Sequence, residues 1–228
     1  MPARPHLAVK LANQASPEAL LAKLKDSYGA PTARAKHVDV PWHSASARLE
    51  IYSTKTLPSA SRDWIWSLFE CNMRCLYEAQ QDGYDAQEKR AEVFHPDSRF
   101  LVLSPSSPAP AAGAAPPRSA PLGFCIFRFD TEETASEDDD ELCDVAYCYE
   151  LQVEGEQHGK GVGRVLMDAL ERTARAWRMD KVMLTVFKAN EQALAFYDKV
   201  GYTEDEIDPG RFGVVDVDYS ILSKSLSP

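Results

Sequence analysis

Apolar positions in the first half of the chain recur at spacings that predict helices around a few strands. The predicted order is a helix at 17–28, a strand at 48–52, helices at 59–77 and 85–94, and a strand at 99–103. The first helix follows Ser16, a good N-cap, and has Pro17 at the first helical position and leucines at helical spacing. The run RFLVL at 99–103 is almost wholly apolar, which indicates a buried strand.

In the second half, strands alternate with helices. The pattern predicts strands at 122–130 and 144–153, a helix at 162–178, a strand at 181–187, a helix at 190–200 and a strand at 219–222. The polar segment 131–141 joins the first two of these strands, which indicates an antiparallel pair. The order of elements therefore predicts an α/β (α+β) protein.

Composition divides the chain into one main domain and appended segments. A length of 228 residues with 44% hydrophobic content suits a single domain. We expect an N-terminal extension at 1–46, the domain at 47–223 and a tail at 224–228. Within the domain, the Pro-, Ala- and Ser-rich segment 104–121 cannot form a packed core and is expected to be a flexible loop, and the acidic segment 131–141 a second loop.

Charge and cysteine content narrow the class of partner. The formal net charge of −10 argues against direct nucleic-acid binding, which relies on clustered Lys and Arg, and a basic peptide is the more natural ligand. The chain lacks a run of about twenty apolar residues and an apolar signal segment, so we expect an intracellular protein that does not enter a membrane. The five cysteines lack paired Cys-x-x-Cys spacing and are expected to be reduced, without a metal.

A glycine-rich turn at 158–163 (HGKGVG) precedes the helix at 162–178. Unpaired backbone N–H groups and the positive end of a helix dipole meet at such a turn, and together they can hold a phosphate group. Glycine permits close approach of the phosphates, and Lys160 and Arg164 add positive charge. The spacing matches neither a P-loop nor a dinucleotide-binding motif. Its place late in the chain, after an antiparallel pair of strands, is typical of the coenzyme A loop of an acetyltransferase.

Residues 147–171 and 181–202 carry a resemblance to a known family. Its most specific parts are the runs YCYELQ at 147–152 and VMLTVFK at 182–188. There the sequence resembles the GCN5-related N-acetyltransferase (GNAT) superfamily, and closely its histone N-alpha-acetyltransferases of the NatD type. The resemblance implies a mixed, mostly antiparallel central sheet that splays after its fourth strand and is flanked by helices. His158 departs from the Arg or Gln that usually begins the superfamily's loop.

The resemblance also implies acetyl-CoA as the co-substrate. Backbone groups freed by the splay would bind the pantetheine arm as an added strand, at Leu151, Gln152 and Val153. The pyrophosphate would lie on the glycine turn, at Gly159, Lys160, Gly161, Val162, Gly163 and Arg164. Asn190 matches the family's coenzyme-approaching residue after the fifth strand.

Acetyl transfer requires a neutral amine, and this points to a chain end as the acceptor and to a carboxylate as the base. An α-amino group titrates at about 7.7–8 and a lysine at about 10.4, so a chain end needs less help. Glu150, beside the coenzyme strand, is predicted as the general base, in agreement with the resemblance. The resemblance adds Tyr149 at the peptide terminus. Regular strand alternation would place these two side chains on opposite faces, and a β-bulge near the splay would bring them together.

The resemblance implies a histone peptide as the substrate, with the terminus Ser-Gly-Arg-Gly of histone H4 and the 2A-type histone. The implied peptide-contacting residues are Tyr77, Asp130, Thr131, Glu132, Tyr147, Tyr149, Thr185 and Tyr219. We expect action without an auxiliary subunit, because the helix at 17–28 would wrap the domain, and a cytoplasmic and nuclear location, with possible contact to the ribosome during synthesis. Two alternatives stay open: an acetyltransferase for lysine or small amines, and a non-enzymatic module that binds coenzyme A or a peptide.

Overall fold

The computed structural model describes residues 6–30, 35–43, 45–80, 83–106, 120–135, 141–214 and 216–226. Within these residues, eight strands form one sheet in the order β1-β2-β3-β4-β5-β6-β8-β7. The strands are Val38–Trp42 (β1), Ala45–Ser53 (β2), Arg99–Pro105 (β3), Gly123–Glu133 (β4), Leu142–Val153 (β5), Lys181–Phe187 (β6), Thr203–Glu204 (β7) and Tyr219–Ser225 (β8). The α-helices are Leu7–Gln14 (α1), Pro17–Ser27 (α2), Ser59–Glu78 (α3), Ala86–Val93 (α4), Val162–Ala176 (α5) and Glu191–Lys199 (α6), and short 3-10 turns lie at Gly155–Gln157 (η1) and Pro209–Phe212 (η2).

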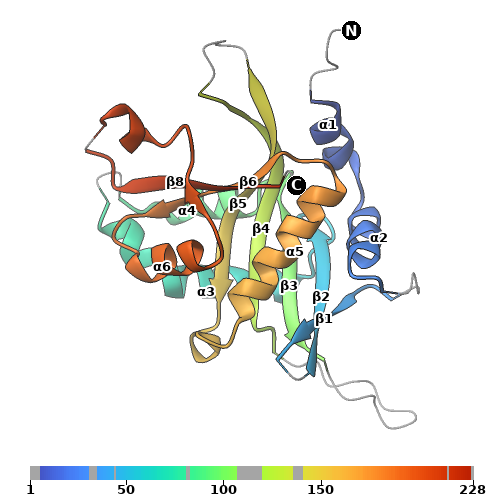
Figure 1. The fold of residues 1–228 in the computed structure, drawn as a ribbon. Helices are drawn as coiled ribbons and strands as arrows, with labels where there is room; N and C mark the ends of the chain where they lie inside the picture. Colours follow the sequence, from blue (N-terminus) through green and yellow to red (C-terminus); the bar gives the residue numbers. More distant parts are fainter. Residues whose placement is uncertain are drawn as a thin grey trace, which may run out of the picture.

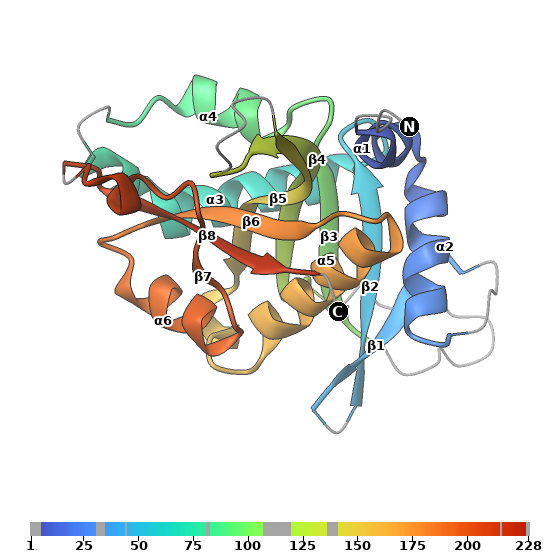
Figure 2. The ribbon, with the colours of Figure 1, turned by 45° about the horizontal axis from the view of Figure 1, so that its top comes forward.

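Helices cover the two faces of the sheet in separate layers (Figures 1 and 2). On one face, α1, α2 and α5 bury their apolar sides in a large cluster that includes Leu20, Leu24, Leu166 and Leu170. On the other face, α3 packs a smaller cluster around Phe69. The sheet is therefore sandwiched between helices, and its centre is buried on both sides.

The sheet is antiparallel except where β5 and β6 run parallel. That pairing covers only Val145 to Cys148 of β5, opposite Lys181 to Leu184 of β6. In the part of the chain that the structure describes, β5 continues beyond Cys148 paired with β4 alone. The two strands thus diverge, and the second half of β5 presents an edge to the space between them.

The fold class predicted from the sequence is confirmed: the protein is α/β, with a mixed, mostly antiparallel sheet flanked by helices. β5, where the sheet splays, is the fourth of the strands that the apolar pattern predicts. An unpredicted strand, β1, precedes them inside the segment 1–46, and the short β7 was also not predicted. Most of the expected loop 104–121, at 107–119, and part of the acidic loop 131–141, at 136–140, lie outside the described residues.

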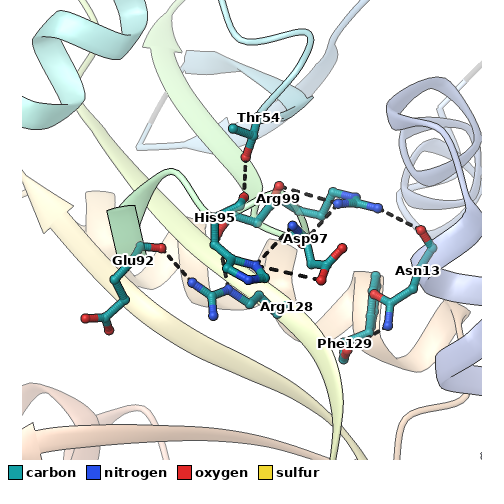
Figure 3. Close-up of polar contacts among 9 residues, drawn as sticks. Asn13, Thr54, Glu92, His95, Asp97, Arg99, Arg128 and Phe129 are labelled. Carbon is teal, nitrogen blue, oxygen red and sulfur yellow. Dashed lines mark hydrogen bonds and ion pairs between the residues drawn. The ribbon is translucent and has the colours of Figure 1, made fainter. Parts of the chain in front are cut away.

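The N-terminal segment is tied to three central strands of the sheet. Asn13 of α1 donates a hydrogen bond to the carbonyl of Phe129 at 2.9 Å, and Nη2 of Arg99 donates to the carbonyl of Asn13 at 2.9 Å (Figure 3). His6, just before α1, lies 2.7 Å from a carboxylate oxygen of Asp144 on β5. The segment expected as an extension is therefore bonded to β3, β4 and β5.

Candidate active site

The divergence of β5 and β6 opens a cleft with two connected lobes. The first, which we call the α4 lobe, has a volume of about 480 Å³ and is walled by α3, α4, β5, β6 and β8. The second, the glycine lobe, has a volume of about 630 Å³ and is walled by α3, β5, the glycine turn and α6. Residues that line both lobes are Met73, Leu151, Gln152, Asn190, Ala193 and Tyr197. The two lobes therefore adjoin along these side chains.

A β-bulge on β5 lies at the point of divergence. In the β4–β5 pair, Ile126 is opposite Glu150 and Phe127 is opposite Cys148, so that Tyr149 is an extra residue on β5. Bulges of this kind re-aim side chains and are common beside active sites. The bulge that a shared face for Tyr149 and Glu150 requires is therefore present.

The bulge reverses the alternation of side chains along β5. Cys148 packs in the cluster beneath α5, and so do Leu151 and Val153, three and five residues further on. Tyr149 packs instead against the cluster beneath α3, and Glu150 lines the α4 lobe. Both predicted catalytic residues thus face the same lobe.

Glu150 is a buried carboxyl group in the α4 lobe, only 8% exposed, and it directly precedes Leu151 and Gln152, which line both lobes. Burial raises its pKa to about 8, although a hydrogen bond from Nε2 of Gln152 to Oε2 of Glu150, at 2.8 Å, acts in the opposite direction. The negative charge of Glu92 on α4 raises the pKa further, and the positive charge of Lys89 lowers it. A carboxyl group that titrates near neutral pH is suited to accept a proton from a reacting amine.

Four tyrosines line the α4 lobe: Tyr197, which also lines the glycine lobe, and Tyr77, Tyr147 and Tyr149. Tyr77 meets the ring of Phe187 edge-on at 4.9 Å. Tyr147 is hydrogen-bonded to Thr185 on β6, and burial raises the pKa of Tyr147 to about 12. The rings of Tyr147 and Tyr149 lie 5.0 Å apart. These side chains form an aromatic wall that narrows the lobe around Glu150.

Arg128 of β4 holds Tyr149 and α4 together. Its guanidinium lies 3.9 Å from the centre of the Tyr149 ring, a cation–π contact. It also donates to the carbonyl of Glu92 at 2.6 Å and to the hydroxyl of Ser98 at 3.2 Å (Figure 3). The last turn of α4, which carries Glu92 into the lobe, is thus fixed to the strand below it.

The predicted acidic positions separate in the structure. Glu132 lines the α4 lobe, and burial together with the neighbouring charge of Asp130 raises the pKa of Glu132. Asp130 itself is exposed and accepts a hydrogen bond from the amide of Thr131 at 2.9 Å. Asp130, Thr131 and Tyr219 are not among the described residues that line the cleft. Tyr219 begins β8, opposite Phe187.

The glycine lobe contains nearly all of the residues predicted to bind the coenzyme. Leu151, Gln152, Val153 and Asn190 line it, and so do Gly159, Gly161, Val162, Gly163 and Arg164. The exception is Lys160, whose carbonyl accepts a hydrogen bond from the indole of Trp42 at 2.8 Å. His158 is also in this lobe, and its Nε2 atom is 3.0 Å from the carbonyl of Val153.

The glycine turn fits a phosphate-bearing ligand. Gly161 has φ +76° and begins α5, a left-handed conformation that other residues rarely adopt. A Cβ atom on Gly163 would come within 3.1 Å of the Phe196 ring, so any larger residue would require that ring to shift away from α5. The first turn of α5 therefore presents its free amides to the lobe, as anion binding at a helix N-terminus requires.

The functional candidates that sequence reasoning missed include Asn72, Lys89, Glu92 and Tyr197, which line the cleft, and Arg128, which contacts Tyr149 from β4. Asn72 continues the apolar stripe of α3 that contains Ile65, Leu68 and Phe69, and a polar residue in such a stripe is a usable signal. Arg128 likewise interrupts a buried strand, between Phe127 and Phe129. Lys89 and Glu92 lie on a charged helix without an apolar side, where sequence gives no reason to choose them.

The structure also bears on metal and membrane binding. Among the described residues, no group of three or more His, Cys, Asp or Glu side chains is placed to hold a metal ion. No described helix is long and apolar enough to cross a lipid bilayer. All five cysteines are free thiols, and Cys125 and Cys148 are in contact at 3.7 Å.

Solved acetyltransferase structures share this fold. NAA60 of Arabidopsis thaliana, crystallised with a bisubstrate analogue, is 12% identical, and the alignment covers 78% of this chain and 99% of that one with a TM-score of 0.53. The NatC complex bound to Gag peptide and CoA is 15% identical, and the alignment covers 79% of this chain and 99% of that one with a TM-score of 0.51. The GNAT domain of S. lividans PAT is 15% identical, and the alignment covers 85% of this chain and 98% of that one with a TM-score of 0.53. At these identities the likeness concerns the fold alone.

The splayed sheet, the glycine turn at the start of α5 and the connected cleft define an enzyme that transfers an acyl group from coenzyme A. The sequence model of the acetyltransferase (GNAT) family matches residues 62–202, which is more than half of the chain. The chain belongs to this family, and it is an acetyl-CoA-dependent acetyltransferase.

Proposed function

We propose that the protein is an N-alpha-acetyltransferase of the NatD type, which transfers acetyl from acetyl-CoA to the free amino terminus of core histones. The observation that carries this proposal is the position of Glu150. It is a buried carboxyl group whose pKa of about 8 is close to that of a chain-end amine, and it lines the α4 lobe directly before Leu151 and Gln152, which line both lobes. The glycine lobe would take the coenzyme and the α4 lobe the peptide.

The pKa of Glu150 suits a chain end better than a lysine. In the reaction, the amine nitrogen attacks the thioester carbon, the carbon–sulfur bond breaks and the coenzyme leaves as a thiolate, and the amine proton passes to Glu150. An α-amine titrates at about 7.7–8, so a base near 8 can accept its proton with little energetic penalty. A lysine amine titrates at about 10.4 and would be mostly charged in the same cleft.

The acidic character of the α4 lobe supports a basic peptide as the substrate. Glu132 and Glu92 both line the lobe, and the whole chain has a formal net charge of −10. An arginine at the third position of Ser-Gly-Arg-Gly needs a carboxylate partner, and Glu132 is the predicted acidic residue that lies in the lobe. The NatC structure, which shares the fold, contains a peptide together with CoA.

The N-terminal helices support action without an auxiliary subunit. α2 buries Leu20, Leu21 and Leu24 against the domain, so this chain itself covers part of the surface beside α5. A cytoplasmic and nuclear location, and contact with the ribosome during histone synthesis, follow from the proposed substrate. Fractionation of cells that express the tagged protein tests the location.

Mass spectrometry of a Ser-Gly-Arg-Gly-Lys peptide incubated with acetyl-CoA tests the function. We expect one added acetyl group on the peptide with a free terminus and none on the same peptide with a blocked terminus. Modification of the blocked peptide would instead indicate a lysine acetyltransferase. Absence of modification in both, with coenzyme A bound, would indicate a binding module.

A further inference from the structure

A chain of hydrogen bonds runs from α3 to the predicted base. Nδ2 of Asn72 donates to Oε1 of Gln152 at 3.0 Å, and Nε2 of Gln152 donates to Oε2 of Glu150 at 2.8 Å. Gln152 and Glu150 are only 5% and 8% exposed. The same nitrogen of Asn72 donates to the carbonyl of Val153 at 3.2 Å, so both of its hydrogens are used.

The direction of this chain depends on Asn72. A glutamine amide can turn by 180° and exchange its donor and acceptor ends. While Asn72 holds the oxygen of Gln152, the NH₂ group of Gln152 faces Glu150, and a donor favours the ionised carboxylate. In the turned orientation the oxygen of Gln152 would face Glu150, where it could accept a hydrogen bond only from the protonated acid.

We propose that Asn72 is a positioning residue that locks the Gln152 amide in the orientation that favours the proton-accepting, ionised form of Glu150. Asn72 acts through Gln152, since no contact joins it directly to Glu150 among the hydrogen bonds of the described residues. Its bond to the carbonyl of Val153 holds it at the edge where β5 borders the glycine lobe. One side chain thus links the coenzyme side of the cleft to the protonation state of the base.

The other ionisable groups around Glu150 belong to elements that a change at Asn72 leaves in place. Glu92 raises the pKa of Glu150 and Lys89 lowers it, and both side chains lie on α4. The groups facing Glu150 from the surrounding elements are Glu92 and Lys89 (α4), Tyr77 (α3), Cys125 (β4) and Tyr197 (α6). A shift caused by Asn72→Ala, which introduces no charge, is therefore assigned to the orientation of Gln152.

Two substitutions separate the orientation effect from the loss of a side chain. Asn72→Ala removes the donor and frees the amide of Gln152 to turn. Asn72→Asp keeps the shape, and an aspartate would accept a bond from Nε2 of Gln152 and hold the turned orientation, but its negative charge also raises the pKa of Glu150 directly. Asn72→Ala is therefore the variant on which the assignment rests. Ser67→Ala is the matched control, since Ser67 is exposed on α3 and its hydroxyl bonds to the carbonyl of Asp63 on the same helix.

The first measurement is the pH dependence of kcat at saturating acetyl-CoA and peptide, and this readout depends on the proposed function. We expect the rising limb to move up by roughly 1 pH unit in Asn72→Ala and at least as far in Asn72→Asp. At pH 7, kcat falls about tenfold, and most of it returns at pH 9. Ser67→Ala keeps the wild-type limb. A rising limb of Asn72→Ala at the wild-type pH, whatever the loss in kcat, would overturn the proposal.

The second measurement needs no substrate, so its failure is distinguishable from failure of the proposed function. The unfolding free energy is measured against pH for the wild type and for Asn72→Ala, each with and without the further substitution Glu150→Gln. In each background, the difference in unfolding free energy caused by Glu150→Gln stops changing with pH above the pKa of Glu150 in the folded state. For Asn72→Ala we expect the levelling point roughly 1 unit above that of the wild type. Identical levelling points contradict the role of Asn72, even if no histone peptide is ever acetylated.

Discussion

Replacing Glu150 with glutamine should stabilise the protein in alkaline solution while removing most of its activity. Glutamine has nearly the same shape, and its amide oxygen can accept the bond from Nε2 of Gln152 that Oε2 of Glu150 now accepts. The change therefore removes the ionisable group and little else. It separates the energetic consequence of a buried acid from its chemical use.

The size of the stabilisation follows from the pKa of Glu150. An unfolded glutamate loses its proton at about 4.3, whereas the folded protein retains the proton on Glu150 up to about 8. Because the raised pKa belongs to an acid, the wild type loses stability as the pH rises between these values, by about 1.4 kcal/mol per unit. From pH 6 to pH 8 this amounts to about 2.3 kcal/mol, because the slope falls as Glu150 itself begins to titrate, and the variant avoids that loss.

Urea unfolding followed by tryptophan fluorescence at pH 6, 7 and 8.5 measures the effect. The advantage of Glu150→Gln over the wild type should grow by about 2–3 kcal/mol between the lowest and highest pH. Glu204→Gln, at an exposed position on β7, is the control and should show a constant difference. An advantage of Glu150→Gln that does not change with pH would refute the assignment of a buried acid that titrates near 8.

The same variant should lose activity by about 100-fold or more in kcat, because the group predicted to accept the amine proton is removed. Binding of coenzyme A by calorimetry should remain unchanged, since Glu150 lines the α4 lobe and not the glycine lobe. Wild-type activity in this variant would exclude Glu150 as the base. Weakened coenzyme binding would show that the lobes are assigned to the wrong ligands.

The remaining predictions concern the lining of each lobe. Glu132→Gln should raise the KM for a Ser-Gly-Arg-Gly peptide about tenfold and leave the KM for acetyl-CoA unchanged, while the control Glu204→Gln, at an exposed position on β7, stays near the wild type. Equal effects of Glu132→Gln on both KM values would show that the lobe does not select the arginine. Gly163→Ala should weaken coenzyme A binding about tenfold in calorimetry, because its Cβ would crowd an α6 ring at 3.1 Å. Gly155→Ala, with open space around it, should bind coenzyme A normally. Equal affinities of the two variants would contradict the proposed binding of the pyrophosphate on the glycine turn. Arg128→Lys should raise the peptide KM and lower the unfolding free energy by about 1–2 kcal/mol, because lysine cannot both stack on the Tyr149 ring and donate to the Glu92 carbonyl as the planar guanidinium does. An unchanged peptide KM would show that Tyr149 does not need this support.

Much of the fold could be predicted because its elements follow simple periodicities. The helix α5 has an apolar stripe and a glycine start, and β3 and β4 are continuous apolar runs, so their burial is evident from composition. α1 was not predicted because no side chain caps its first turn, with His6 in a left-handed conformation. β1 was not predicted because Pro41 argues against a strand, and the sheet tolerates it there because β1 is an edge strand.

The site was predictable where it depends on local sequence and less so where it depends on packing. The glycine turn and the coenzyme edge follow from short motifs, and all of these positions except Lys160 line one lobe. Asp130, Thr131 and Tyr219 were taken from the resemblance, and the structure places them outside the cleft lining, so their roles remain predictions. Asn72 reaches the site because α3 packs across β5. Its partner Gln152 is 80 residues away in sequence, so the local pattern around Asn72 cannot predict this hydrogen bond.

The central claim is that one cleft holds the coenzyme on the glycine turn and a peptide amine beside Glu150. A crystal structure with a conjugate of coenzyme A and the Ser-Gly-Arg-Gly peptide tests it most directly. We predict that the diphosphate lies on the amides of Gly161 and Gly163 and that the peptide nitrogen is within one water molecule of the Glu150 carboxylate. A peptide whose terminus lies outside the α4 lobe, with Glu150 in contact with neither ligand, would contradict the account.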